Sequence, residues 1–143
     1  MPWKMSLALL LLTVGFSLIT VAFAILMGAK PDNEAPQVTV TNPQNNDRRV
    51  PSDLTAITIT FSEPMMTDRF SFCIDPAAKF PEANGPATFS FDGKTVTYPV
   101  KLEPGRDYAI WLNNAQFQMF QDRSGNILEP FLLQFQTAPL EQL

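Results

Sequence analysis

A run of 25 residues without a charged side chain, residues 5–29, divides this 143-residue chain into two unlike parts. As an α-helix the run would be about 37 Å long, enough to cross the ~30 Å hydrocarbon core of a bilayer. The apolar core of a signal peptide is shorter, about 7–15 residues, although Ala22-Phe23-Ala24 fits an A-x-A cleavage site. We therefore expect an uncleaved transmembrane helix over residues 1–29, with a cytoplasmic N-terminus; a cleaved signal peptide is the alternative.

Small residues form two stripes on this helix at about 100° per residue. The first comprises Thr13, Ser17, Thr20, Ala24 and Gly28, and the second, on roughly the opposite side, comprises Ala8, Gly15, Ala22 and Ala29. Small side chains let helix backbones approach closely, and Ser and Thr can form hydrogen bonds across the contact. We expect other transmembrane subunits and membrane lipid as partners.

The rest of the chain is acidic. Beyond Lys30 it has eight Lys and Arg against fourteen Asp and Glu, a formal charge of −6, which argues against nucleic-acid binding. The chain has no His, which excludes His-based catalysis and His metal ligation. Its single Cys excludes an internal disulfide and multi-Cys metal sites. No cofactor and no small-molecule substrate are expected.

After a short polar linker, residues 30–35, seven segments alternate apolar and polar residues and are separated by turn residues. The segments are 37–41, 54–61, 70–74, 87–91, 94–100, 106–113 and 131–137. This pattern predicts an all-β fold, a seven-stranded antiparallel β-sandwich over residues 36–138, followed by a tail, residues 139–143. The alternation also predicts which residues face inward, among them Phe70, Phe72, Ile74, Ala87, Phe89 and Phe91.

Two local motifs support this fold. Asp92-Gly93 between alternating segments is a hairpin signal. The stretch LEPGRDY, residues 102–108, is typical of a tyrosine corner, in which the hydroxyl of Tyr108 would bond back to the backbone near Glu103 or Pro104.

Several segments together resemble a known family. They are PQNNDRRVP (43–51), ITITFSEPM (57–65), DGKTVTY (92–98), LEPGRDY (102–108), DRSGN (122–126) and FQT (135–137). In this order they resemble the bacterial Ig-like domains of S-layer and other surface or exported proteins. The resemblance implies a non-catalytic β-sandwich used as a spacer, stalk or interaction module outside the cytoplasm.

One candidate interaction surface follows from the alternation. If Tyr108, Ile110 and Leu112 face inward, Ala109 and Trp111 face outward. The nearby stretch 113–121 is polar but interrupted by apolar residues, and Met65 and Met66 lie in another loop. Aromatic residues and Met are enriched in interfaces. The candidate surface comprises Trp111, Phe117, Met119 and Phe120; alternatively, residues 113–121 fold back over Trp111 and bury these side chains.

Other polar patterns have structural explanations. Asp122, Ser124 and Asn126 are spaced like the start of a Ca²⁺ loop, but too few ligands follow, and an Asx-type turn is the simpler interpretation. Glu63 with Asp68, or Asp92 with Asp107, could form a carboxylate pair for glycoside hydrolysis. Cys73 is expected to be a small buried or half-buried residue on the opposite side of its strand from its neighbours.

These patterns favour a non-catalytic, single-span membrane protein with an extracytoplasmic Ig-like domain, acting as a structural or accessory subunit of a larger membrane complex. The alternative is a membrane-anchored adhesin or glycan-binding module, and a hydrolase is the weakest interpretation. The six-residue linker reaches only about 20 Å when fully extended, which is short for a projecting adhesin.

Overall fold

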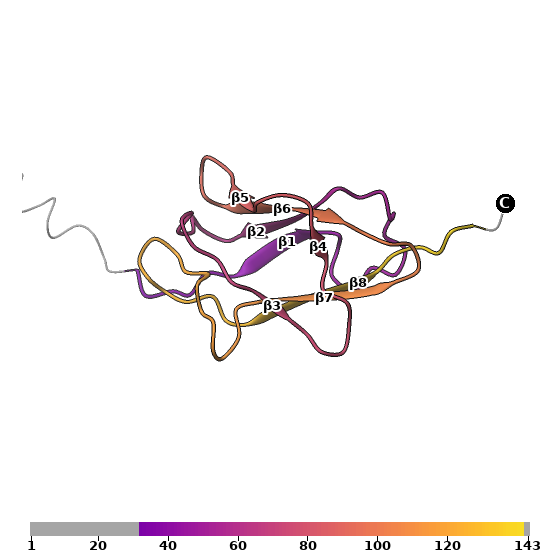
Figure 1. Cartoon of the computed structure of the whole chain (residues 1–143). Helices are drawn as coiled ribbons and strands as arrows, with labels where there is room; N and C mark the ends of the chain where they lie inside the picture. Colours follow the sequence, from indigo (N-terminus) through magenta and orange to yellow (C-terminus); the bar gives the residue numbers. More distant parts are fainter. Residues whose placement is uncertain (1–31, 142–143) are drawn as a thin grey trace, which may run out of the picture. The chain divides into compact units, whose positions relative to one another are not determined.

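The computed structural model describes residues 32–141, which form two antiparallel sheets packed face to face (Figure 1). The strands are β1 (Val38–Asn42), β2 (Ala56–Phe61), β3 (Phe72–Ile74), β4 (Glu82–Ala83), β5 (Thr88–Phe89), β6 (Thr95–Lys101), β7 (Asp107–Leu112) and β8 (Phe131–Gln136). One sheet has the order β1-β2-β6-β4, with β5 also paired to β6, and the other has the order β3-β7-β8.

The chain divides after Asp32, and the strands all belong to the unit Asn33–Leu143. Between residues 32 and 141 there is no helix with the length and apolar character needed to cross a membrane. The expected transmembrane helix, with both of its small-residue stripes, lies outside the described residues.

The core lies between the two sheets and follows the predicted alternation on four strands. Strands β2 and β6 contribute side chains that are at most 7% exposed: Ile57, Ile59, Phe61, Val96, Tyr98 and Val100. Strands β7 and β8 contribute from the other side Tyr108, Ile110, Leu112, Leu133 and Phe135. On these strands every second residue is apolar and buried, as expected for a strand with one face on the core.

The number of strands is eight, not the predicted seven. The additional strand, β4, consists of Glu82 and Ala83, which pair with Lys101 and Val100. Both residues of β4 are exposed, so no apolar alternation marks the strand. Strand β4 forms because it pairs with an edge of β6, and that edge becomes available only when the sheet has folded.

Two of the predicted inward faces are wrong in part. Phe91 is fully exposed, because β5 ends at Phe89 and Phe91 lies in the hairpin that follows. In β3, Phe72 packs against the core, but Ile74 is 71% exposed and Phe70, which precedes the strand, is 40% exposed. Strand β3 has only three residues and lies at a sheet edge, where the opposite sheet does not cover its end.

The strand order places the described chain's two ends at opposite ends of the sandwich (Figure 1). We call the end at which the chain enters the linker end; it is formed by residues 32–37, 62–71, 90–94 and 113–130. The opposite, far end is formed by residues 43–55, 75–81, 102–106 and 137–141.

Candidate interaction surfaces

The outer face of β7 is less open than the alternation predicts. Ala109, expected to face solvent, is only 3% exposed, and residues 75–79, which we call the crossing segment, pair with β7 through Lys79. The N–H of Lys79 donates to the carbonyl of Asp107 (3.1 Å), and the N–H of Ala109 donates to the carbonyl of Lys79 (3.1 Å). Trp111 is half-buried, and its indole Nε1–H donates to Oδ2 of Asp75 at 2.9 Å. This hydrogen bond fixes the Trp111 side chain to the crossing segment.

A cleft of about 480 Å³ lies beside this crossing segment, on the outer face of β7 and β8. Ala109 and Gln134 contribute to its lining, with residues 46–48, Asp75, Ala77 and Ala78 lining it as well. Trp111 is not among the lining residues. Three carboxylates, Asp47, Asp75 and Asp107, and one guanidinium, Arg48, give the cleft an acidic character.

The stretch 113–121 folds back on the sandwich, and this splits the candidate surface. Phe120 is completely buried and contacts Phe61 and Phe72, with ring centroids 5.6 and 5.2 Å apart, so its placement on an exposed surface is wrong. Phe117 and Met119 remain 51% and 43% exposed. The difference arises because Phe120 begins a short hairpin that turns the chain inward toward the core.

Asn113 fixes this fold-back and was not singled out by the sequence. It is fully buried with φ at 60°, a left-handed conformation that Asn tolerates better than most residues. Its Oδ1 accepts from Ser71 Oγ (2.7 Å) and from the N–H of Phe120 (2.9 Å). Its Nδ2 donates to the carbonyls of Phe120 (3.0 Å) and Leu128 (2.8 Å). One side chain thus satisfies backbone groups that would otherwise be buried without a partner.

The loop at Asp122 is a turn stabilised by its own carboxylate. Oδ1 of Asp122 accepts from the N–H groups of Ser124 and Asn126, both at 2.8 Å, and Oδ2 accepts from Nδ2 of Asn126 at 2.7 Å. These bonds are those of an Asx-type turn. Asp122 is 1% exposed, so the three donors also compensate for the burial of its charge.

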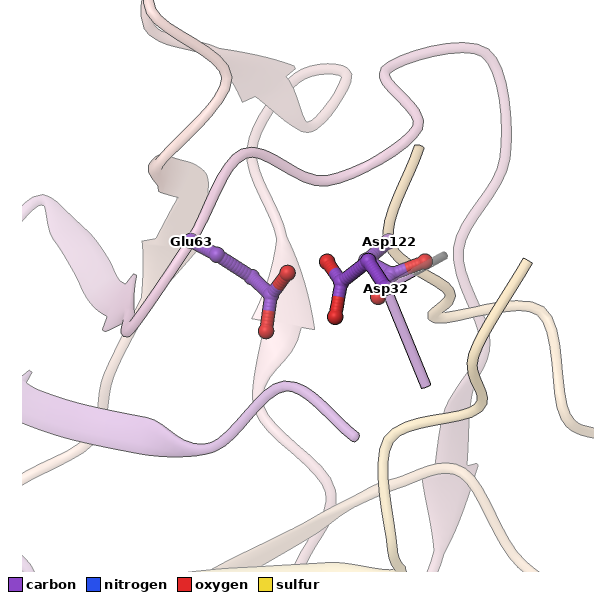
Figure 2. A group of neighbouring side chains, drawn as sticks. All are labelled: Asp32, Glu63 and Asp122. Atoms are coloured by element: carbon purple, nitrogen blue, oxygen red, sulfur yellow. The ribbon is translucent and has the colours of Figure 1, made fainter. Parts of the chain in front are cut away.

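Figure 2 shows the carboxylates of Glu63 and Asp122, which have oxygens within 4.8 Å of each other. Asp32, drawn with them, is the last residue of the preceding unit of the chain. Two carboxylates, one of them already bonded by three donors, are far fewer than the 6–8 oxygen ligands that Ca²⁺ takes.

In the first carboxylate pair considered for hydrolysis, one member has another charged partner. In the second pair, the two carboxylates lie at opposite ends of the sandwich. Asp68 pairs with Arg69 (3.2 Å), which lowers the pKa of its carboxyl group through a hydrogen bond and through charge. Asp92 lies in the linker-end hairpin, whereas Asp107 begins β7 at the far end, so the second pair is not brought together. In the hairpin, the hydroxyl of Ser90 (2.6 Å) and the N–H of Lys94 (3.0 Å) donate to Asp92 and lower its pKa.

Cys73 faces away from Phe72, beside Trp111, and is buried. Burial raises the pKa of its thiol. A raised pKa disfavours the thiolate, which is the reactive form of Cys.

The turn between β6 and β7 has the geometry of a tyrosine corner. The N–H of Glu103 donates to the hydroxyl of Tyr108 at 2.8 Å. The carboxylate of Glu103 accepts from Lys79 (2.6 Å) and Arg106 (3.1 Å), and its carbonyl accepts from the hydroxyl of Thr137 (2.6 Å). Lys79 and Arg106 hold the pKa of this carboxyl group below its ordinary value. This corner therefore links β6, β7, the crossing segment and the end of β8.

The sequence matches the family described as "Bacterial Ig-like domain" over residues 32–137, which is most of the chain. The chain belongs to the bacterial Ig-like domain family. The resemblance drawn from its motifs is thereby confirmed, and the Ig-like domain is an all-β structure of two antiparallel sheets.

Three solved structures are similar to this chain. The crystal structure of CopC from Methylosinus trichosporium OB3b matches with a TM-score of 0.57 and 14% sequence identity, covering 76% of this chain and 98% of that chain. The S-layer protein rSbsC(31-844) matches with a TM-score of 0.43 and 18% identity, over 73% of this chain and 14% of that chain. Domains 1–6 of SbsC give a TM-score of 0.44 and 17% identity, over 74% and 14%. No curated protein sequence matches this chain.

One feature of this Ig-like domain had no signal in the sequence, whereas a second could have been predicted from it. The outer cleft depends on residues 46–48 and Asp75–Ala78 meeting over β7 and β8, and these segments are far apart in the chain. The exposure of Phe91 could have been found, because it immediately precedes the Asp92-Gly93 turn and can occupy a loop position as readily as a strand position.

Proposed function

We propose that this chain is a non-catalytic, single-span membrane protein whose Ig-like domain lies outside the cytoplasm and acts as an accessory or structural subunit of a larger membrane complex. The observation that carries the proposal is the position of the linker. The described chain enters the sandwich at one end, with Pro36 already buried and β1 beginning at Val38. A polar linker of only six residues therefore separates the domain from the apolar run, residues 5–29.

A tether of about 20 Å supports a role beside the membrane. The domain can contact neighbouring subunits only near the bilayer surface, where the small-residue stripes of the helix would also meet partner helices. Membership of the bacterial Ig-like domain family favours a location outside the cytoplasm.

The test is whether the helix holds the protein in its assembly. Ser17→Leu and Ala24→Leu should prevent close helix approach and reduce co-purification of this chain with its complex in mild detergent. Val14→Leu is the matched control, because it enlarges a residue between the two stripes. Membrane insertion should survive in all three variants, since Leu favours it.

Intact-mass measurement of the membrane-extracted protein tests the anchor itself. The proposal requires residues 1–24 to be present. A mature N-terminus at Ile25 would show a cleaved signal peptide, and wild-type co-purification of both Leu variants would remove the argument for an accessory subunit.

A second candidate function, an anchored binding module or adhesin, is favoured by the outer cleft of about 480 Å³. Its carboxylates suit a cationic or polyhydroxylated ligand. Asp107→Asn and Arg48→Ala change exposed residues of this cleft. If the chain is such a binding module, both substitutions should abolish capture of the detergent-solubilised chain on a glycan or peptide array. Ser17→Leu should leave this capture unchanged.

A further inference from the structure

The exposed apolar side chains are divided unequally between the two ends of the sandwich. Five large ones, between 39% and 107% exposed, lie in the linker-end loops: Phe70, Phe91, Phe117, Met119 and Ile127. At the far end of the described chain, segments 43–55, 75–81 and 102–106 contain no exposed large apolar residue, and the tail, residues 137–141, contains one, Leu140, which is 76% exposed. Single exposed apolar residues are ordinary, whereas a concentration of five in the loops of one end is of the kind that marks an interaction site.

The loops that carry these side chains are held by hydrogen bonds. The hairpin bearing Phe91 is closed by the N–H of Ser90 donating to the carbonyl of Thr95 (2.8 Å), and by the N–H of Gly93 donating to the carbonyl of Ser90 (2.9 Å). The carbonyl of Phe117 accepts from the N–H of Asn114 at 2.9 Å. Both aromatic rings are therefore presented outward by closed turns.

Loop 62–71 joins the other two loops into one surface. The N–H of Met65 donates to the carbonyl of Gly93 (2.9 Å) in the hairpin. The N–H of Met66 donates to the carbonyl of Gln121 (2.9 Å) on the other side. The loops that carry these side chains thus lie at one connected end of the domain, the end at which the described chain enters (Figure 1).

The chain enters the domain at this same end. The N–H of Gln37 donates to the hydroxyl of Ser62 (3.0 Å), and the N–H of Ser62 donates to the carbonyl of Gln37 (2.8 Å), so the residue before β1 is fixed to loop 62–71. The surface that is richest in exposed apolar residues is therefore the one closest along the chain to the apolar run.

We propose that the linker-end loops insert Phe91, Phe117 and Met119 into the lipid headgroup region of the membrane that anchors the protein. This inference rests on the proposed function, because it requires the helix to be retained. Aromatic and aliphatic side chains bind membrane interfaces by burying apolar area among the headgroups and upper acyl chains. A short tether raises the effective concentration of the loops at the membrane to the millimolar range, so weak intrinsic affinity suffices.

The charges at this end specify the kind of lipid. The linker-end segments contain seven carboxylates and only three cations, Arg69, Lys94 and Arg123. Anionic lipid attracts basic segments and would repel this surface. The insertion is therefore apolar in origin, and it favours zwitterionic over anionic headgroups.

The experiment uses the full chain reconstituted in phosphatidylcholine vesicles, with a nitroxide label at Gln118→Cys in a Cys73→Ala background. Gln118 is exposed and lies between Phe117 and Met119, so both apolar side chains stay in place. Asp53→Cys, at the far end, provides the reference position. Collisions of each label with oxygen, which concentrates in lipid, and with a water-soluble nickel chelate are measured by electron paramagnetic resonance.

The ratio of oxygen to nickel accessibility should be several-fold higher at position 118 than at position 53. The double change Phe117→Ser with Met119→Ser should lower the ratio at 118 towards the reference. Val40→Ser, which removes an equally apolar residue (61% exposed) from β1, should leave it unchanged. Replacing a third of the lipid by phosphatidylglycerol should lower it.

Three results would overturn the inference, and they are distinguishable. Vesicles that float with the chain, but with position 118 as open to nickel as position 53, would show an anchored domain whose loops stay in water; the proposed anchor would then stand. A label at 118 shielded from both reagents would show a protein contact, such as a second copy, in place of lipid. A chain that does not float with vesicles would refute the anchor itself.

Discussion

Asn113 and Ser71 share a hydrogen bond of 2.7 Å between side chains that are both buried, and this bond joins the end of β7 to the start of β3. The hydroxyl of Ser71 also accepts from the N–H of Met119 at 3.0 Å. The pair therefore determines how the stretch 113–121 folds back, and hence which of its apolar side chains remain exposed.

Asn113→Ala should destabilise the domain strongly. The change removes four hydrogen bonds and leaves buried groups of Phe120 and Leu128 without partners, at a cost of about 1–3 kcal/mol for each unsatisfied group before relaxation. Asn46→Ala is the matched control, because Asn46 also has positive φ, 69°, but is exposed. Urea unfolding should show a loss for Asn113→Ala at least twice that for Asn46→Ala; equal losses would mean that backbone strain alone accounts for Asn113.

Tyr108→Phe should cost about 0.5–1.5 kcal/mol, the net contribution of one hydrogen bond. The hydroxyl of Tyr108 bonds to the N–H of Glu103 at 2.8 Å, whereas that of Tyr98 reaches the carbonyl of Pro81 only at 3.4 Å. Tyr98→Phe should therefore cost less. If the midpoint of thermal unfolding is the same for Tyr108→Phe and the unaltered protein, the hydroxyl of Tyr108 does not stabilise the corner.

The charge of Glu103 should make stability depend on pH in the acid range. Lys79, and then Arg106, depress the pKa of Glu103 in the folded state below its ordinary value of 4.5. A depressed pKa contributes stability that is present above pH 4.5 and is lost as the pH falls through the lower, folded-state pKa. Glu103→Gln should therefore lower the melting temperature more at pH 7 than at pH 3, and high salt should reduce the difference.

Glu82→Gln, which neutralises an exposed carboxylate on β4, is the control. The check is a series of melting curves from pH 3 to 7. A constant difference between Glu103→Gln and the unaltered protein across this range would contradict the linkage.

Gly93 and Gly125 both have positive φ, 74° and 89°, but only Gly93 is crowded. A Cβ at Gly93 would lie 3.2 Å from the carbonyl oxygen of Met65, whereas a Cβ at Gly125 would meet nothing within 4 Å. Gly125→Ala should cost about 1–2 kcal/mol from the left-handed conformation alone. Gly93→Ala should cost more in the same denaturation assay, and it should disturb the bond between Met65 and Gly93; a smaller loss at Gly93 would show that loop 62–71 moves aside freely.

Period-2 alternation predicted the buried faces of β2, β6 and β7, because each is flanked by other strands and has one face on the core. The same rule failed at Phe91 and Ile74, where the strand ends or the opposite sheet gives no cover. Alternation describes which side of a strand a residue occupies, but not whether anything lies on that side.

The candidate surface was predictable only in part, for a related reason. Phe117 and Met119 are exposed, but Phe120 is buried because Asn113 bonds to its N–H and carbonyl and draws the chain inward. In the sequence, Asn113 is a polar residue followed by Asn114, and nothing in this pattern indicates that Asn113 is completely buried. Contacts between distant segments, such as Asn113 with Ser71 and Lys79 with Asp107, set these positions.

The opposite placement of the described chain's two ends has a mechanical consequence. A pull between residues 32 and 141 is applied to β1 in one sheet and, through the tail, to β8 in the other, along the direction of the strands. Hydrogen bonds of an antiparallel ladder run perpendicular to the strands, so such a pull loads the bonds of a ladder together in shear and does not open them one by one. The domain is thus built to transmit tension along its length as a stiff link.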